Sequence, residues 1–176
     1  MPNVLKLGKP LIIDSFEKDG KKITFNYYAC DSFDLLPYKQ CTQVSAIALD
    51  RDQMVIIKNG KKNTWNIPGG TIEKGETFEQ TLKRELQEET NVNVIKWKPI
   101  GFQQVIEDGK EPYFQLRTAA IVKPFGPFVS DPAGSVTEIK WINPKDFGTY
   151  VTWGDKAKVM IETAIMLIQK MGDKTK

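Results

Sequence analysis

The chain has 176 residues, of which 40% are hydrophobic and 27% charged, a composition typical of one soluble globular domain with a substantial core. Its 25 lysines and arginines against 22 aspartates and glutamates give a net charge of +3, which is too small to predict nucleic-acid binding. The absence of histidine excludes histidine-ligated zinc and leaves acid–base chemistry to carboxylates, lysine or tyrosine.

The hydrophobic runs of the sequence are short. The run at 118–122 is far shorter than the stretch of about 20 apolar residues that crosses a bilayer. In residues 1–13, Lys6, Lys9 and Pro10 interrupt the leucines and isoleucines, so this segment does not have a signal-peptide pattern. We therefore expect a cytoplasmic protein without a membrane partner.

The first part of the chain predicts a β-hairpin. Residues 11–17 and 22–29 are rich in strand-forming side chains, and Lys-Asp-Gly at 18–20 supplies the turn. We interpret 1–42 as an N-terminal extension built on this hairpin. It carries five large apolar side chains, too many to leave in water: Ile12, Phe16, Ile23, Phe25 and Tyr27. The hairpin therefore packs on its own domain, or exchanges with a second subunit to form a homodimer.

The main body opens with two predicted strands, at 44–50 and 54–58. The loop that follows, 59–63, is rich in lysine and asparagine. Its lysines are solvated in any fold, and Lys61 or Lys62 is also a candidate for contacting a substrate phosphate.

The hydrophobic period then changes to that of a helix. Apolar residues recur every four positions at Phe78, Leu82 and Leu86. Thr77 is a good N-cap, and Gln80 three positions later completes a capping box. Asn91 stands where a left-handed residue ends a helix. We therefore predict a helix from about Phe78 to Thr90.

The remaining elements are strands and a final helix. Segments 94–106 and 113–123 predict a second hairpin, 124–135 a long loop rich in proline and glycine, and 136–143 a last strand. A C-terminal helix is indicated by an apolar stripe: Ala157, Met160, Ile161, Ala164, Ile165, Ile168 and Met171. Together these elements predict an α+β fold, with a mixed β-sheet and a helix on each face.

Three glutamates on the first helix raise a question of charge. Glu85, Glu88 and Glu89 stand at i, i+3 and i+4, so they project from one side of the helix and repel one another by about 1 kcal/mol in total. Arg84 can offset this repulsion if the face is simply solvated. A hard divalent cation such as Mg²⁺ is the alternative, because a carbonyl of the glycine turn at 68–70 together with three carboxylates forms an all-oxygen ligand set.

The stretch 70–92 resembles the Nudix box, G-x5-E-x7-R-E-U-x-E-E-x-G-U with U aliphatic. One position departs from the motif, where Asn91 replaces a glycine. Both residue types accept the left-handed conformation, so the helix end is retained. The residues that fall on motif positions are Gly70, Glu76, Arg84, Glu85, Leu86, Glu88, Glu89 and Val92.

This resemblance implies a fold and an activity. The fold is a Nudix-type α/β/α sandwich around a mixed sheet, covering 43–176 after the hairpin extension. The activity is hydrolysis of a nucleoside diphosphate linked to a group X, with Mg²⁺ or Mn²⁺ as cofactor and nucleoside triphosphates placed ahead of nucleotide sugars. The alternative is a Nudix-fold module that senses a nucleotide without cleaving it. Such modules commonly lose a box carboxylate, whereas all are present here.

The resemblance also implies residue roles. The metal ligands would be Gly70, through its carbonyl, together with Glu85, Glu88 and Glu89. Arg84 would orient a glutamate, and Glu76 would brace the loop against the helix. The group that deprotonates water varies within the family, so the candidates are Glu88 and a carboxylate on a later loop, for which we favour Glu138. Weaker candidates are Asp131, Glu107 and Glu111.

The identity of X stays open at this point. The proline that marks ADP-ribose hydrolases after the box is replaced by Asp108. Candidate substrate contacts are Trp65, Tyr113 and Lys61. Core packing explains Trp65 equally well.

Overall fold

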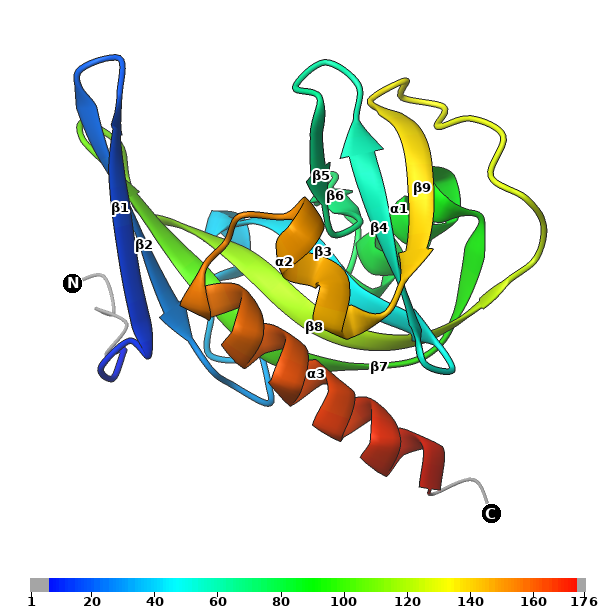
Figure 1. The fold of residues 1–176 in the computed structure, drawn as a ribbon. Coiled ribbons are helices and arrows are strands. Elements are labelled where there is room, and N and C mark those ends of the chain that lie inside the picture. The colour runs from blue at the N-terminus through cyan, green and yellow to red at the C-terminus, as the bar shows by residue number, and fades with distance from the viewer. Residues whose placement is uncertain (1–6, 174–176) are drawn as a thin grey trace.

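The computed structural model describes residues 7–173, and one mixed, curled sheet dominates it (Figure 1). The strand order is β1-β2-β7-β8-β3-β4-β5, with β6 paired to β3 and β9 to β4. β3 and β8 run parallel, and the other paired strands run antiparallel. The strands are β1 (Ile12–Lys18), β2 (Lys21–Tyr28), β3 (Cys41–Asp50), β4 (Gln53–Asn59), β5 (Thr64–Asn66), β6 (Gly69–Thr71), β7 (Val92–Glu107), β8 (Tyr113–Pro124) and β9 (Val136–Ile142).

Helices cover both faces of this sheet, as predicted. The α-helices are α1 (Phe78–Thr90), α2 (Phe147–Tyr150) and α3 (Asp155–Asp173), and two short 3-10 turns are η1 (Tyr38–Gln40) and η2 (Pro144–Asp146). Figure 1 shows α3 crossing in front of the sheet and α1 behind it. No helix in the described part of the chain is long and apolar enough to span a membrane.

Each face of the sheet has its own hydrophobic core. Side chains alternate along β3, so that Val44, Ala46 and Ala48 pack toward α1, while Ile47 and Leu49 pack toward α3. The predicted stripe of the C-terminal helix lies in the second of these cores, at Ala157, Met160, Ile161 and Ala164. The α+β sandwich expected from the sequence is therefore confirmed.

The ends of α1 are also as predicted. Thr77 and Gln80 form the reciprocal capping box, and Asn91 adopts the left-handed conformation with φ 55° and ψ 44°. Leu82 and Leu86 are fully buried between the helix and the sheet. These local signals fix the helix, and with it the direction in which its glutamates point.

The predicted N-terminal hairpin forms and extends the sheet of its own chain. β2 pairs with β7 from Ile23 opposite Glu107 to Tyr28 opposite Phe102. The Tyr27 side chain is only 1% exposed, and its hydroxyl donates a 2.9 Å hydrogen bond to the carbonyl of Ile100. The pairing and this buried bond dock the hairpin without a second subunit. Exchange with a partner stays a prediction, as does the division between an extension and a main domain.

Some elements were not predicted. The short strands β5 and β6 flank the proline–glycine turn, and η2 with α2 forms a compact corner before α3. They are three to four residues long, which is too short for a hydrophobic period to show.

The docking of the hairpin gives the first prediction. Tyr27→Phe should lower the free energy of unfolding by about 1 kcal/mol, because it removes a buried hydrogen bond and leaves a carbonyl without its donor. Urea denaturation measures this change. Tyr28→Phe is the matched control, since Tyr28 is half-buried and stacks on Phe102 through its ring. Equal effects of the two substitutions would contradict the docking.

Candidate active site

A cavity of about 750 Å³ opens between the N-terminal hairpin and the segment that joins β6 to α1. One end is acidic and is lined by Gly69, Gly70, Glu85 and Glu89. The other end includes Phe25 from the hairpin, Arg117 from β8 and Lys156 from α3. The cavity therefore joins residues that lie far apart in the sequence.

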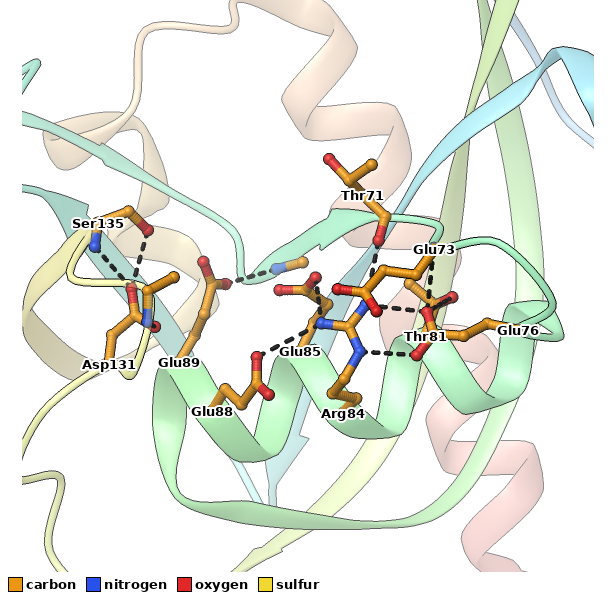
Figure 2. A network of polar contacts seen from close by, with 12 residues as sticks. Thr71, Glu73, Glu76, Thr81, Arg84, Glu85, Glu88, Glu89, Asp131 and Ser135 are labelled. Carbon is orange, nitrogen blue, oxygen red and sulfur yellow. Dashed lines mark hydrogen bonds and ion pairs between the residues drawn. The ribbon is translucent and has the colours of Figure 1, made fainter.

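Arg84 organises the acidic end (Figure 2). Its Nε and Nη2 donate to the two carboxylate oxygens of Glu76 at 2.7 and 2.9 Å, a bidentate pair. Nη2 also donates to the carbonyl of Thr71 at 3.1 Å. Nη1 donates to Glu85 at 2.7 Å and to Glu88 at 3.4 Å. One guanidinium thus ties β6, the following loop and α1 together.

Glu76 is the main partner of that guanidinium. The bond from Arg84 is the largest cause that lowers the pKa of Glu76 to about 2. The same carboxylate accepts from the Thr81 hydroxyl at 2.7 Å and from the Glu73 amide at 3.2 Å. Glu76 therefore stays ionised and braces the loop against the helix.

Glu89 is in the opposite situation. It is 7% exposed, and it accepts a 2.8 Å hydrogen bond from the Gly69 amide. Burial is the main cause that raises the pKa of Glu89 to about 8, with the charges of Glu85, Asp131 and Glu88 acting in the same direction and the Gly69 bond against them. Burial likewise raises the pKa of Glu85, although Arg84 offsets part of the effect. Glu85 therefore shares one guanidinium with Glu76 and Glu88, and Glu89 is held mainly in its protonated form at neutral pH.

The two glycines of the turn make this arrangement possible. A Cβ atom on Gly70 would overlap the carboxyl group of Glu85. Gly69 has a φ of +142°, and a Cβ there would overlap the backbone of Val44 and Ser45 on the neighbouring strand. The turn therefore has to be free of side chains for Glu85 to reach the loop backbone.

The donor set at this end fits a hard divalent cation. All its atoms are oxygens, from Glu85, Glu88, Glu89 and the carbonyl of Gly70. The Glu85 carboxyl fills the space that a side chain at position 70 would take, and Glu88 lies beside it but outside the cavity lining. Within residues 7–173, no three acidic or cysteine side chains converge closely enough to hold a metal as they stand. Arg84 holds Glu85 and Glu88 in this arrangement, so metal binding requires these carboxylates to turn toward Glu89.

A later carboxylate also lies close to this cluster. Asp131 is buried beside Glu89 (Figure 2). Burial opposes its ionisation, but bonds from Val136, Ser135 and Ala133 outweigh that effect and lower the pKa of Asp131. Its oxygens are occupied by the turn that they hold. Asp131 thus adds negative charge to the cluster and fixes the loop beside it.

The structure does not bring Glu138, the carboxylate favoured from the sequence, into the cavity. Glu138 lies on β9 opposite Lys58, with 3.7 Å between Nζ and the carboxylate. Its position in a regular strand turns it away from α1. Among the weaker candidates, Glu107 pairs with Lys110 at 2.9 Å, and Glu111 lies in the exposed turn that follows.

The three substrate candidates also lie outside the cavity lining. Trp65 packs at an edge-to-face angle on Tyr150 and under the ammonium of Lys140, so the structure fits the core-packing alternative. Its strand neighbours face the cavity instead. Lys61 is exposed, whereas Lys62 lines the cavity. Tyr113 lies at the start of β8, before the part of that strand that lines the cavity.

Sequence reasoning missed Arg117, Gln103 and Gln115, which form the floor of the other end of the cavity. The sequence did hold one signal for Arg117: a charged residue in the otherwise mostly apolar strand segment Leu-Arg-Thr-Ala-Ala indicates a buried charge.

Comparison with known proteins gives a consistent family match. A family model described as NUDIX domain matches residues 39–162. An 8-oxo-dGTP diphosphatase of Buchnera aphidicola is 49% identical over 47 residues, 27% of this chain and 36% of that protein. A putative 8-oxo-dGTP diphosphatase of Bacillus subtilis is 28% identical over 97 residues, 54% of this chain and 60% of that protein. The chain spans between 36% and 60% of the length of the curated relatives that it matches.

Solved structures show the same fold. A NUDIX hydrolase from Nitrosomonas europaea superposes with a TM-score of 0.56 at 19% identity, covering 70% of this chain and 87% of the other. The NUDIX domain of Shewanella oneidensis NrtR, complexed with ADP ribose, superposes with a TM-score of 0.56 at 21% identity, covering 73% and 88%.

The raised pKa of Glu89 predicts a pH-dependent stability in the metal-free protein. In the native state the Glu89 carboxyl keeps its proton up to about pH 8, whereas in the unfolded chain it loses that proton near pH 4.3. Stability from this group is thus present below about pH 4.3 and is lost as the pH rises to about 8. Glu89→Gln should therefore unfold at higher denaturant than the wild type at pH 8.5 in EDTA, and at a similar concentration near pH 4.5.

Glu79→Gln is the control for that experiment, because Glu79 lies on the same helix but is exposed and paired with Lys83 at 2.6 Å. It should give no gain at either pH. A loss of stability in Glu89→Gln at pH 8.5 would show that Glu89 serves as a structural anion instead.

Proposed function

This chain belongs to the Nudix family, and we propose that it is a hydrolase that cleaves a diphosphate bond in a nucleoside diphosphate linked to a group X. The observation that carries the proposal is the pair of buried carboxyl groups, Glu85 and Glu89, whose pKa values are raised, against the side-chain-free turn at Gly69 and Gly70. Because Glu85 shares its one guanidinium with Glu76 and Glu88, ionising Glu89 beside it is costly unless a ligand supplies positive charge. A cation bound to a diphosphate is such a ligand.

The cofactor that fits is Mg²⁺ or Mn²⁺, held by Glu85, Glu88, Glu89 and the Gly70 carbonyl. When bound, such a cation neutralises the diphosphate and lowers the pKa of an attacking water. Arg84 acts as a positioning residue, because it holds Glu85 directly and fixes the loop through Glu76. Glu88 is the candidate base, since it is held only loosely by Arg84 at 3.4 Å and its carboxylate can reach water.

The proposed substrate class is supported by the relatives. Curated relatives include 8-oxo-dGTP diphosphatases, and a structural neighbour is complexed with ADP ribose. We place nucleoside triphosphates ahead of nucleotide sugars. Lys62 takes the place of Lys61 as the candidate contact to a phosphate, because it is the lysine of that loop that lines the cavity.

A substrate screen tests this proposal. Purified protein is incubated with dNTPs, oxidised dNTPs, ADP-ribose, NADH and dinucleoside polyphosphates, with and without Mg²⁺. We expect turnover of at least one compound that requires the metal. Turnover of none would favour a binding module that senses a nucleotide.

The same assay tests the assigned glutamates. Glu85→Gln and Glu89→Gln keep size and helix propensity but remove a hard anionic ligand, so turnover should fall by about 100-fold or more. Glu79→Gln should keep the wild-type rate, because this residue faces solvent. Full activity of both ligand variants would contradict the metal assignment.

A further inference from the structure

The end of the cavity opposite the glutamates carries a buried positive charge. Arg117 is 7% exposed, and its hydrogen-bond partners are all neutral. They are the Ser45 hydroxyl at 3.1 Å, the Leu116 carbonyl at 3.2 Å, and the side-chain oxygens of Gln103 at 3.2 Å and Gln115 at 2.9 Å. Its Nε has no partner among the described residues. Burial lowers the pKa of this guanidinium to about 10, so it remains charged.

A second cation stands beside it. The Lys156 side chain is 11% exposed and extends between the rings of Phe25 and Trp153, at 5.4 and 5.8 Å from their centroids. Its ammonium lies 3.7 Å from Asp14, whose side chain is 57% exposed and therefore screened by water. Burial is the main cause that lowers the pKa of Lys156, and the charge of Arg117 lowers it further. Arg117 and Lys156 thus lie close together, and Asp14 is the one acidic side chain paired with them among the described residues.

The sheet fixes how far this end lies from the glutamates. Gly69 pairs with Ser45 on β3, and Ser45 pairs with Arg117 on β8. Gly69 also donates to Glu89. Two strand spacings separate Gly69 from Arg117, a backbone distance of about 10 Å along one row of the sheet. The two ends therefore lie within the reach of one substrate molecule.

A purely structural role explains only part of this arrangement. Arg117 links β3, β7 and β8 through its hydrogen bonds, and such links stabilise a sheet. A neutral side chain can make similar bonds without the cost of a buried charge. Arginine is favoured where an oxyanion is bound, because its fork matches carboxylate and phosphate. Glutamine side chains can turn aside to admit such a group.

We propose that Arg117 and Lys156 form a subsite for a second oxyanion of the substrate, a phosphate monoester or a carboxylate outside the scissile diphosphate. This inference rests on the proposed function, and it narrows the substrate class to diphosphates that carry such a group. The aromatic rings of Phe25 and Trp153 flank the subsite and can cover the sugar or base that bears it.

Matched pairs of compounds test the subsite. NADPH with NADH, and coenzyme A with dephospho-coenzyme A, differ by one phosphate. UDP-glucuronic acid with UDP-glucose differs by one carboxylate. We expect kcat/KM to favour the member with the additional phosphate or carboxylate in at least one pair by about tenfold or more, the range for hydrogen bonds to charged groups. A preference in the phosphate pairs alone, or in the carboxylate pair alone, identifies the oxyanion.

Variants assign the preference to these residues. Lys156→Met keeps the stem that packs between the rings and removes the charge, so the preference should fall by about tenfold, with the greater loss of kcat/KM for the member that carries the additional oxyanion. Arg117→Gln should lower the preference in the same direction. If Arg117→Gln does not fold, the result for Lys156→Met alone tests the subsite. Lys158→Gln, on the exposed side of the same helix, is the control and should keep the wild-type preference.

Two results would overturn the inference. One is equal kcat/KM within every pair, and the other is an equal loss for both members in Lys156→Met. If the wider screen shows metal-dependent turnover in either case, the proposed function stands and only the subsite is wrong. If no compound in either set is hydrolysed, both are wrong.

Discussion

The acidic end of the cavity depends on how the guanidinium of Arg84 distributes its hydrogen bonds. It gives its strongest bonds to Glu76 and Glu85 and a weaker one to Glu88, and it also contacts the Thr71 carbonyl. These bonds close the loop between β6 and α1 and hold Glu85 against the glycine turn. A single positive charge cannot neutralise the whole cluster. The consequence appears in the contrast between Glu76, with a pKa lowered to about 2, and Glu89, with a pKa raised to about 8.

The cavity is polarised along its length. Glu85 and Glu89 place clustered carboxyl groups near Gly69, and Arg117 with Lys156 places positive charge two strands away. The two ends do not stabilise each other by direct contact, because the described residues form no ion pair between them. The N-terminal hairpin and the start of α3 complete the positive end. The extension before the family-matched region therefore contributes a wall of the cavity as well as strands to the sheet.

The parts that could be predicted from the sequence rest on local interactions. Thr77, Gln80 and Asn91 determine the ends of α1 within a few residues of themselves, and the i, i+3, i+4 spacing places the glutamates on one side. The hairpin turn at Asp19 and Gly20 is equally local, and both residues have positive φ.

The parts that could not be predicted depend on distant partners. Arg117 acquires its environment from Ser45, 72 residues away, and Lys156 acquires its own from the hairpin. The position of Glu138 depends on distant partners for a related reason, because a long loop allows Asp131 to reach α1 while strand pairing holds Glu138 opposite Lys58. Side chains alternate along β5, so Thr64 and Asn66 face the cavity while Trp65 points away from it.

The central claim is that the buried carboxylates are a site for a divalent cation. Calorimetric titration of the metal-free protein with Mg²⁺ at pH 7, repeated in buffers of different ionisation enthalpy, tests it most directly. Because Glu89 holds a proton up to about pH 8, binding should release about one proton per chain, and Glu89→Gln should abolish the release. Absence of Mg²⁺ binding, or binding with the same heat in every buffer, would contradict the account.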